Sequence, residues 1–214
     1  MIKAVLFDLD GTLIDTNELI FNSFSHAFKS VLNMELPQKE ITTMFGRPLK
    51  YSFEKYTQDK LEEMIHSYRS YNEERHDNMC FAFDGVKDML GKLKEMGIKL
   101  AVVTSKRKVL AERGMKIAGI YEMFDIIVSP ENTEKHKPEG EPALKACELL
   151  GVLPEEALMV GDSHLDILCG QNAGCKTCGV KYTTLQIKEL EARKPDFFID
   201  NPLDVISVIE EKAV

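Results

Sequence analysis

The stretch Asp8-Leu9-Asp10-Gly11-Thr12-Leu13 directly follows an apolar run over residues 3–7. Such a run predicts a buried strand, and the glycine lets the chain turn where that strand ends. Two carboxylates at the end of a buried strand cost several kcal/mol unless something binds them. A divalent cation and a phosphoryl group would supply that compensation. The stretch therefore predicts a metal and anion site, with an ordinary Asp-Gly turn as the alternative.

Apolar runs that predict strands recur along the chain, at residues 3–7, 98–104, 125–129, 157–161, 177–180 and 197–199. Amphipathic stretches that predict helices lie between most of them, at residues 86–96, 109–118, 143–150 and 167–173. Alternation of strands and helices favours an α/β fold, a doubly wound parallel sheet of the Rossmann-like kind with helices on both faces.

One segment interrupts this alternation, because residues 15–79 show helical periodicity only, punctuated by Pro37, Gly46 and Pro48. We therefore expect two parts: an α/β core formed by residues 1–14 and 80–214, and a helical cap formed by residues 15–79. Ligands of doubly wound sheets bind outside the carboxyl ends of the strands. Since the insertion leaves from that end, we expect the cap to lie over the site.

Polar residues follow four of the predicted strands. Asp8 and Asp10 follow the first, Thr104 the second, Lys137 the third and Asp162 the fourth. Because the carboxyl ends of parallel strands meet at one edge of the sheet, we expect these residues to lie together. Carboxylates, a hydroxyl and an ammonium group are the parts that phosphoryl transfer needs.

These segments resemble the four motifs of the haloacid dehalogenase superfamily. They are Asp8-Leu9-Asp10-Gly11-Thr12, the strand end Thr104-Ser105, Lys137-Pro138, and Gly161-Asp162-Ser163-His164-Leu165-Asp166. The likeness is to the phosphoglycolate phosphatase-like branch, which has a helical cap after the first motif, and within it to a pyrophosphatase type. One departure is Gly140, where this branch often has proline; we expect it to loosen the loop that positions Lys137.

The resemblance and the chemistry of the side chains imply the same catalytic roles. Asp8 is expected to attack phosphorus and form an aspartyl-phosphate. Asp10 is expected to protonate the leaving oxygen and later to accept a proton from the hydrolytic water. Thr104 and Lys137 are expected to hold the oxygens of the transferring group.

An all-oxygen site suits Mg²⁺, with the Asp8 carboxylate, the backbone carbonyl of Asp10, Asp162 and water as ligands. Asp166 is expected to belong to this metal site, where it holds a metal-bound water or Lys137. The alternative for Asp166 is an acid that is favoured by the dipole at a helix N-terminus.

Four further residues are candidates for binding substrate. The backbone N–H groups around Gly11 can face phosphoryl oxygens. Ser105 and Lys106 are expected to begin the helix after the second strand, where backbone amides assist anion binding; Lys106 is alternatively a solvated side chain. Arg47 is a candidate cap cation for the distal end of the substrate, and a solvated surface arginine is the alternative.

The composition restricts the partners. A net charge of −8 and a pI of about 5.2 argue against a nucleic-acid partner and against an anionic membrane surface. The chain shows neither an apolar stretch long enough to cross a bilayer nor the pattern of a signal peptide, which predicts a cytoplasmic protein. The five cysteines are expected to be reduced, and the pair Cys175 and Cys178 to be buried small side chains instead of a zinc or redox site.

The leading function is a Mg²⁺-dependent phosphohydrolase acting on a small anionic phosphate compound, with inorganic diphosphate as the preferred substrate. Phosphoglycolate is the first alternative, and a phosphomutase of the β-phosphoglucomutase kind is the second. A non-enzymatic scaffold is disfavoured because every acid that the chemistry requires is present. The oligomeric state stays open.

Overall fold

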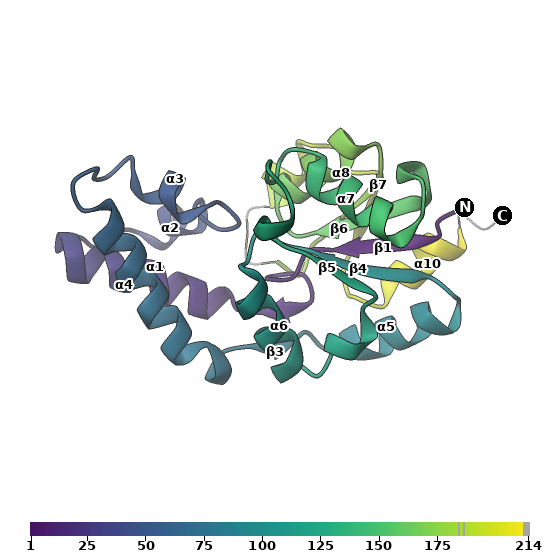
Figure 1. The fold of residues 1–214 in the computed structure, drawn as a ribbon, viewed down its shortest axis with the longest axis horizontal. Helices are drawn as coiled ribbons and strands as arrows, with labels where there is room; N and C mark the ends of the chain where they lie inside the picture. Colours follow the sequence, from purple (N-terminus) through teal and green to yellow (C-terminus); the bar gives the residue numbers. More distant parts are fainter. Residues whose placement is uncertain (184, 186, 212–214) are drawn as a thin grey trace. The chain divides into compact units, whose positions relative to one another are not determined.

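A six-stranded parallel sheet forms the centre of the core, in the order β5-β4-β1-β6-β7-β8 (Figure 1). The computed structural model describes residues 1–183, 185 and 187–211. The strands of this sheet are β1 (Ala4–Phe7), β4 (Lys99–Val103), β5 (Ile126–Val128), β6 (Ala157–Gly161), β7 (Lys176–Val180) and β8 (Phe197–Ile199). The predicted α/β class and the doubly wound parallel sheet are confirmed.

Helices cover both faces of the sheet. Figure 1 shows α7 and α8 on one face and α5 and α10 on the other. The helices of the core are α5 (Val86–Glu95), α6 (Lys108–Ile117), α7 (Glu141–Leu150), α8 (His164–Ala173), α9 (Ile187–Glu191) and α10 (Asp204–Glu210). Four short 3₁₀ turns complete the described helical elements, at His76–Asn78, Tyr121–Met123, Pro130–Asn132 and Pro154–Glu156.

The position of β1 explains why the first motif lies at the centre. Its four residues are fully buried, as the apolar run predicts. The chain passes from β1 to β4 and β5 on one side, and then returns to β6, β7 and β8 on the other. Phe7 pairs with Val102 of β4 and with Val160 of β6. The three strands therefore end at the same edge, at the point where the strand order reverses.

The chain divides into two compact units, one of Met1–Asp15 with Phe81–Val214 and the other of Thr16–Cys80. Both connections between them run through a two-stranded antiparallel ribbon, β2 (Ile14–Asp15) with β3 (Phe81–Ala82). The first unit contains the sheet, and the second contains the helical insertion.

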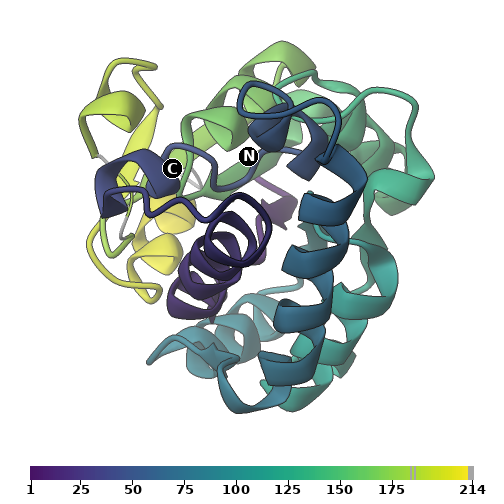
Figure 2. The same cartoon turned by 90° about the vertical axis from the view of Figure 1, so that its left-hand side faces the viewer.

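The insertion is helical, and its helices are α1 (Asn17–Leu32), α2 (Gln38–Thr42), α3 (Leu49–Phe53) and α4 (Leu61–Arg75). Figure 2, like Figure 1, shows α1 and α4 side by side. Aromatic side chains form the core of this unit: the Phe24 ring lies 5.5 Å from Phe53 and 4.8 Å from Tyr68, edge to face. Asn72 donates a hydrogen bond to Ser23 across the two long helices (3.1 Å), which satisfies both buried polar groups.

All five cysteines are free and buried, as the sequence predicts. The Sγ atoms of Cys147 and Cys175 lie 4.0 Å apart in the packing between α7 and the start of β7. Among the described residues, no helix is both long enough and apolar enough to span a bilayer.

The loop before α7 is held firmly, and the expectation that Gly140 loosens it is wrong. The Glu141 carboxylate accepts hydrogen bonds from the backbone N–H groups of Glu134 and Lys135 (2.9 Å each). Asn172 of α8 donates to the carbonyl oxygen of Pro138 (2.9 Å). A Cβ atom on Gly140 would lie 2.7 Å from the backbone of α8 at Asn172 and Ala173. Glycine is therefore required by the close approach of two backbones.

Replacing Gly140 with alanine should lower the free energy of unfolding by about 1–3 kcal/mol, because backbone atoms of α8 cannot rotate away from the new methyl group. Gly91 inside α5 provides a matched control, because a Cβ there meets nothing within 4 Å. Gly91→Ala should raise the unfolding free energy by about 0.5–1 kcal/mol. Urea unfolding of both variants measures the two signs. Stabilisation of the same size in both would contradict the packing argument.

Candidate active site

Asp8 is the first polar residue beyond β1. Its backbone N–H donates to the carbonyl oxygen of Val160 (2.9 Å), so the strand pairing continues through Asp8. Gly11 follows with φ of +84°, a conformation that favours glycine. A Cβ atom there would also lie 2.2 Å from Oδ2 of Asp162. The Asp-x-Asp-Gly turn thus brings the backbone against a second carboxylate of the site.

Lys137 links the cluster from the loop after β5. Its ammonium nitrogen donates to Oδ1 of Asp8 at 2.7 Å and to Oδ1 of Asp166 at 2.5 Å. Both ion pairs are buried. Burial alone would lower the pKa of Lys137, but the carboxylates of Asp166 and Asp8 raise it above the usual lysine range. Lys137 is therefore a permanent cation at the centre of the site.

Asp162 and Asp166 come from the turn that follows β6. Asp166 has a second bonding partner besides Lys137, because its Oδ2 accepts from the backbone N–H (3.0 Å) and hydroxyl (2.6 Å) of Ser163. This is the capping box that starts α8. A Cβ on Gly161 would lie 2.3 Å from that of Asp166, so glycine leaves room for it. Asp166 both caps the helix and holds Lys137. The two interpretations made from the sequence, a partner of Lys137 and an acid at a helix N-terminus, therefore apply together.

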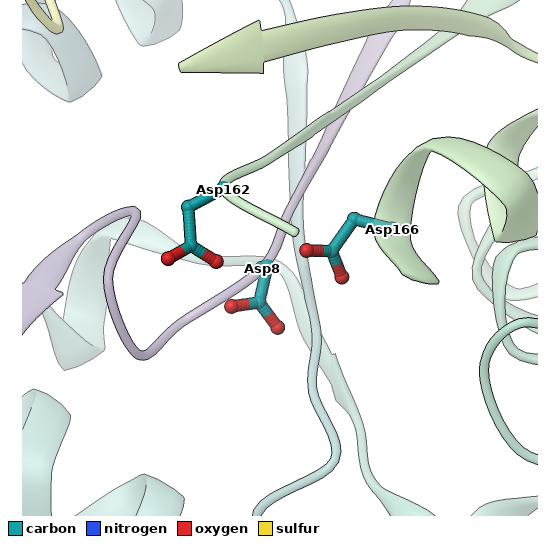
Figure 3. A group of neighbouring side chains, drawn as sticks. All are labelled: Asp8, Asp162 and Asp166. Atoms are coloured by element: carbon teal, nitrogen blue, oxygen red, sulfur yellow. The ribbon is translucent and has the colours of Figure 1, made fainter. Parts of the chain in front are cut away.

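Three buried carboxylates converge at the edge of the sheet, as Figure 3 shows for Asp8, Asp162 and Asp166. One ligand atom from each lies within 4.8 Å of the others. Three carboxylates against the single ammonium group of Lys137 give a formal charge of −2.

The electrostatics of this cluster show how unfavourable that charge is. Burial raises the pKa of Asp8 to about 7, with Lys137 opposing the change and Asp166 adding to it. Burial also raises the pKa of Asp162, and the carboxylates of Asp166 and Asp8 raise it further. A divalent cation would restore neutrality, and oxygen-only donors are those that Mg²⁺ and Ca²⁺ prefer. The donor set therefore fits the metal that the sequence predicts.

Asp10 points its carboxylate to a different partner. Oδ1 of Asp10 accepts from the ammonium group of Lys106 at 2.8 Å, and both side chains are largely buried. Asp10 thus does not join the three converging carboxylates, and the role of its backbone carbonyl toward the metal stays a prediction. Lys106 is not a solvated side chain.

Thr104 directly follows β4, the strand that pairs with β1. Its backbone N–H donates to Val128 (3.0 Å), and its hydroxyl oxygen accepts from the backbone N–H of Lys106 (3.0 Å). The expected helix start is wrong: α6 begins at Lys108, so Ser105 and Lys106 lie in the turn before it. The backbone N–H of Lys106 already donates to the Thr104 hydroxyl, which weakens the prediction that it binds an anion at a helix N-terminus. Ser105 is a turn residue next to the site.

Arg47 belongs to the helical insertion, where it lies on an exposed bend between Gly46 and Pro48. Its role toward a substrate stays a prediction. The structure thus brings together Asp8, Lys137 and Asp166 by direct contact, Asp162 by convergence and Gly11 by its close approach to Asp162.

Two residues at this edge were not predicted from the sequence. Thr183, in the loop after β7, donates a hydrogen bond to Oδ2 of Asp162 (2.9 Å). Ser163 caps α8 and binds Asp166. The spacing of Ser163 and Asp166 is a recognisable capping-box pattern. For Thr183 the available signal was weaker: it follows a strand of the same sheet, as the other site residues do.

Comparison with known proteins shows the family to which this chain belongs. The model of the haloacid dehalogenase-like hydrolase family matches residues 5–180. A protein of Clostridium perfringens named "Putative pyrophosphatase PpaX" is 56% identical, over 99% of each chain. A "Pyrophosphatase PpaX" of Bacillus cereus strain AH820 is 42% identical, over 98% of this chain and 97% of that protein.

A solved structure has the same fold over its full length. It is described as a "predicted phosphoglycolate phosphatase" from Haemophilus somnus, and it is 26% identical with a TM-score of 0.85, covering 97% of this chain and 98% of that one. The family model covers more than half of the chain, and the relatives match it over nearly its full length. The chain is an enzyme that belongs to the haloacid dehalogenase-like hydrolase family.

Proposed function

We propose that this hydrolase cleaves inorganic diphosphate in a Mg²⁺-dependent reaction, with Asp8 as the nucleophile. The observation that carries the proposal is the buried cluster of three carboxylates around Lys137, at the carboxyl ends of parallel strands. The choice of diphosphate is supported by the names of relatives that match this chain over nearly its full length.

Four residues of the site have a defined task in this reaction. An oxygen of Asp8 attacks phosphorus, the bond to the leaving oxygen breaks, and an aspartyl-phosphate forms. Asp10 donates a proton to the leaving oxygen and then accepts one from the water that hydrolyses the intermediate. Lys137 and Thr104 bind the oxygens of the transferring group, where negative charge must be stabilised.

The proposed metal site consists of the Asp8 carboxylate, the backbone carbonyl of Asp10 and Asp162. Asp166 supports this site through Lys137, because both of its oxygens accept hydrogen bonds from Lys137 and Ser163. When bound, Mg²⁺ would offset the repulsion between an anionic nucleophile and an anionic substrate.

A panel of substrates tests the proposal: diphosphate, phosphoglycolate, glucose phosphates and p-nitrophenyl phosphate, each with and without Mg²⁺. We expect phosphate release to require Mg²⁺. We also expect kcat/KM for diphosphate to exceed the others at least about 100-fold, which corresponds to about 2.7 kcal/mol of transition-state preference.

Phosphoglycolate is the second candidate, because the matching solved structure from Haemophilus somnus is described as a phosphatase for it. A preference for phosphoglycolate in the panel would replace the diphosphate assignment and keep the mechanism. Formation of a bisphosphorylated sugar from glucose phosphate would instead indicate a phosphomutase.

A further inference from the structure

We propose that Thr183 is a positioning residue that holds Asp162 in its metal-binding orientation and thereby sets the affinity of the site for Mg²⁺. This inference rests on the proposed Mg²⁺-dependent function. It adds a contribution from the loop after β7, a segment that carries none of the four motifs.

The hydrogen bonds of the Thr183 hydroxyl define its direction. The hydroxyl oxygen accepts from the backbone N–H of Leu185 at 3.0 Å, and it lies 2.9 Å from Oδ2 of Asp162. A hydroxyl has only one proton to donate. Since the backbone N–H of Leu185 can only donate, that proton is available for the carboxylate. Thr183 therefore acts as a donor to Asp162.

The two residues just before Thr183 anchor the start of this loop. The backbone N–H of Lys181 donates to Ile199 of β8 (2.9 Å). The hydroxyl of Tyr182 donates to the carbonyl oxygen of Thr12 (3.0 Å), and its ring lies 5.2 Å from that of Phe83. The loop is thus joined directly to the turn of the first motif. A shift of Thr183 would require these contacts to break.

Among the described residues, Asp162, like Asp8, has a single hydrogen-bond donor to its carboxylate, whereas Asp166 has two. Asp8 is held by Lys137, and Asp166 by both Lys137 and Ser163. Within the described part of the chain, the Thr183 hydroxyl is the hydrogen-bond donor to the Asp162 carboxylate. That bond occupies Oδ2 and leaves Oδ1 available to a cation.

Outer groups of this kind orient the ligands of metal sites, and their loss costs about 10–100-fold in metal affinity. Without the hydroxyl, the Asp162 side chain would rotate away from the two neighbouring carboxylates, because the cluster carries excess negative charge. Binding of Mg²⁺ would then have to restore the orientation. The cost should appear in metal affinity and not in the rate of the metal-saturated enzyme.

Titration calorimetry with MgCl₂ alone, on the full chain without substrate, tests the inference. Thr183→Val keeps the shape of the side chain and removes the hydroxyl, whereas Thr183→Ser keeps the hydroxyl. We expect the Kd for Mg²⁺ to rise 10–100-fold in Thr183→Val and to stay close to the wild-type value in Thr183→Ser. Thr43→Val, which removes an exposed hydroxyl that donates to the Glu40 carbonyl, controls for the substitution itself.

Steady-state kinetics then separate positioning from a purely structural role. In Thr183→Val the Mg²⁺ concentration for half-maximal rate should rise as the Kd does, and kcat at saturating Mg²⁺ should stay near the wild-type value. Unchanged Mg²⁺ affinity in Thr183→Val would overturn the inference, and so would an equal loss in Thr183→Ser. If wild-type protein binds Mg²⁺ but does not cleave diphosphate, the proposed substrate is wrong while the role of Thr183 stands.

Discussion

Replacing Asp8 with asparagine is expected to lower kcat/KM about 10⁴-fold or more, a loss of roughly 5 kcal/mol of transition-state stabilisation. Asparagine has nearly the same shape, and its oxygen can still accept the hydrogen bond that Lys137 donates to Oδ1. It cannot form the acyl-phosphate bond. The loss therefore reports the nucleophile and not a displaced lysine. Phosphate release at saturating Mg²⁺ measures it.

Asp8→Asn should also make the metal-free protein more stable at neutral pH. A gain in stability would show that the loss of activity does not come from a loss of structure. Burial raises the pKa of Asp8 from 3.8 to about 7, so the ionised carboxylate destabilises the folded state. An acid whose pKa is raised in the folded state lowers the free energy of unfolding once it ionises. This destabilisation is absent below about pH 4 and complete above about pH 7. Relative to wild type, the unfolding free energy of Asp8→Asn should therefore increase across that interval.

Urea unfolding in the presence of a chelator, at several pH values, measures this difference. Asp88→Asn, an exposed change in α5, is the matched control and should leave activity unchanged. Activity of Asp8→Asn near the wild-type level would contradict the nucleophilic role. A folded, more stable and inactive protein is the expected combination.

Much of the fold could be predicted because buried strands and amphipathic helices leave periodic patterns. The strands at 157–161 and 197–199 have the predicted bounds, and the other four differ by one residue at one or both ends. The site followed from one topological rule, since residues after parallel strands meet at one edge. That rule predicts that Asp8, Lys137 and Asp162 lie together, as they do in the structure.

The contacts that escaped prediction lie in loops, where no periodicity exists. Lys106 pairs with Asp10 from the turn after β4, in which its backbone N–H donates to the Thr104 hydroxyl. Thr183 reaches Asp162 from a loop in which the preceding residue, Tyr182, donates to Thr12. These arrangements depend on segments far apart in the sequence.

Gly140 is another case in which a contact between distant segments could not be predicted from the sequence. A glycine inside a loop predicts local freedom, and here it marks the place where two backbones approach. Freedom is a property of the isolated chain, whereas close approach is a property of the packed one. Only the position of α8 distinguishes them.

Replacing Asp10 with asparagine is expected to lower kcat/KM by about 10²–10⁴-fold for a substrate whose leaving oxygen needs a proton. The loss should be much smaller for p-nitrophenyl phosphate, because nitrophenolate leaves without protonation. Asparagine keeps an oxygen that can accept from Lys106, so the side chain should stay in place. Mg²⁺ affinity should also be retained, since the proposed ligand is the backbone carbonyl. An alkyl phosphate and the nitrophenyl ester, assayed side by side, give the comparison.

The two half-reactions can be separated in the same variant. The value of kcat/KM reports events up to the first irreversible step, which in the proposed mechanism is formation of the aspartyl-phosphate. In the same proposal Asp10 is the base for hydrolysis of that intermediate, and a slow second step would limit kcat alone. Asp10→Asn should therefore release one equivalent of nitrophenolate per enzyme in a burst, followed by slow turnover. If kcat/KM fell equally for both esters, or if no burst appeared, Asp10 would not be the group that moves the proton, and Lys106 beside it would be the next to test.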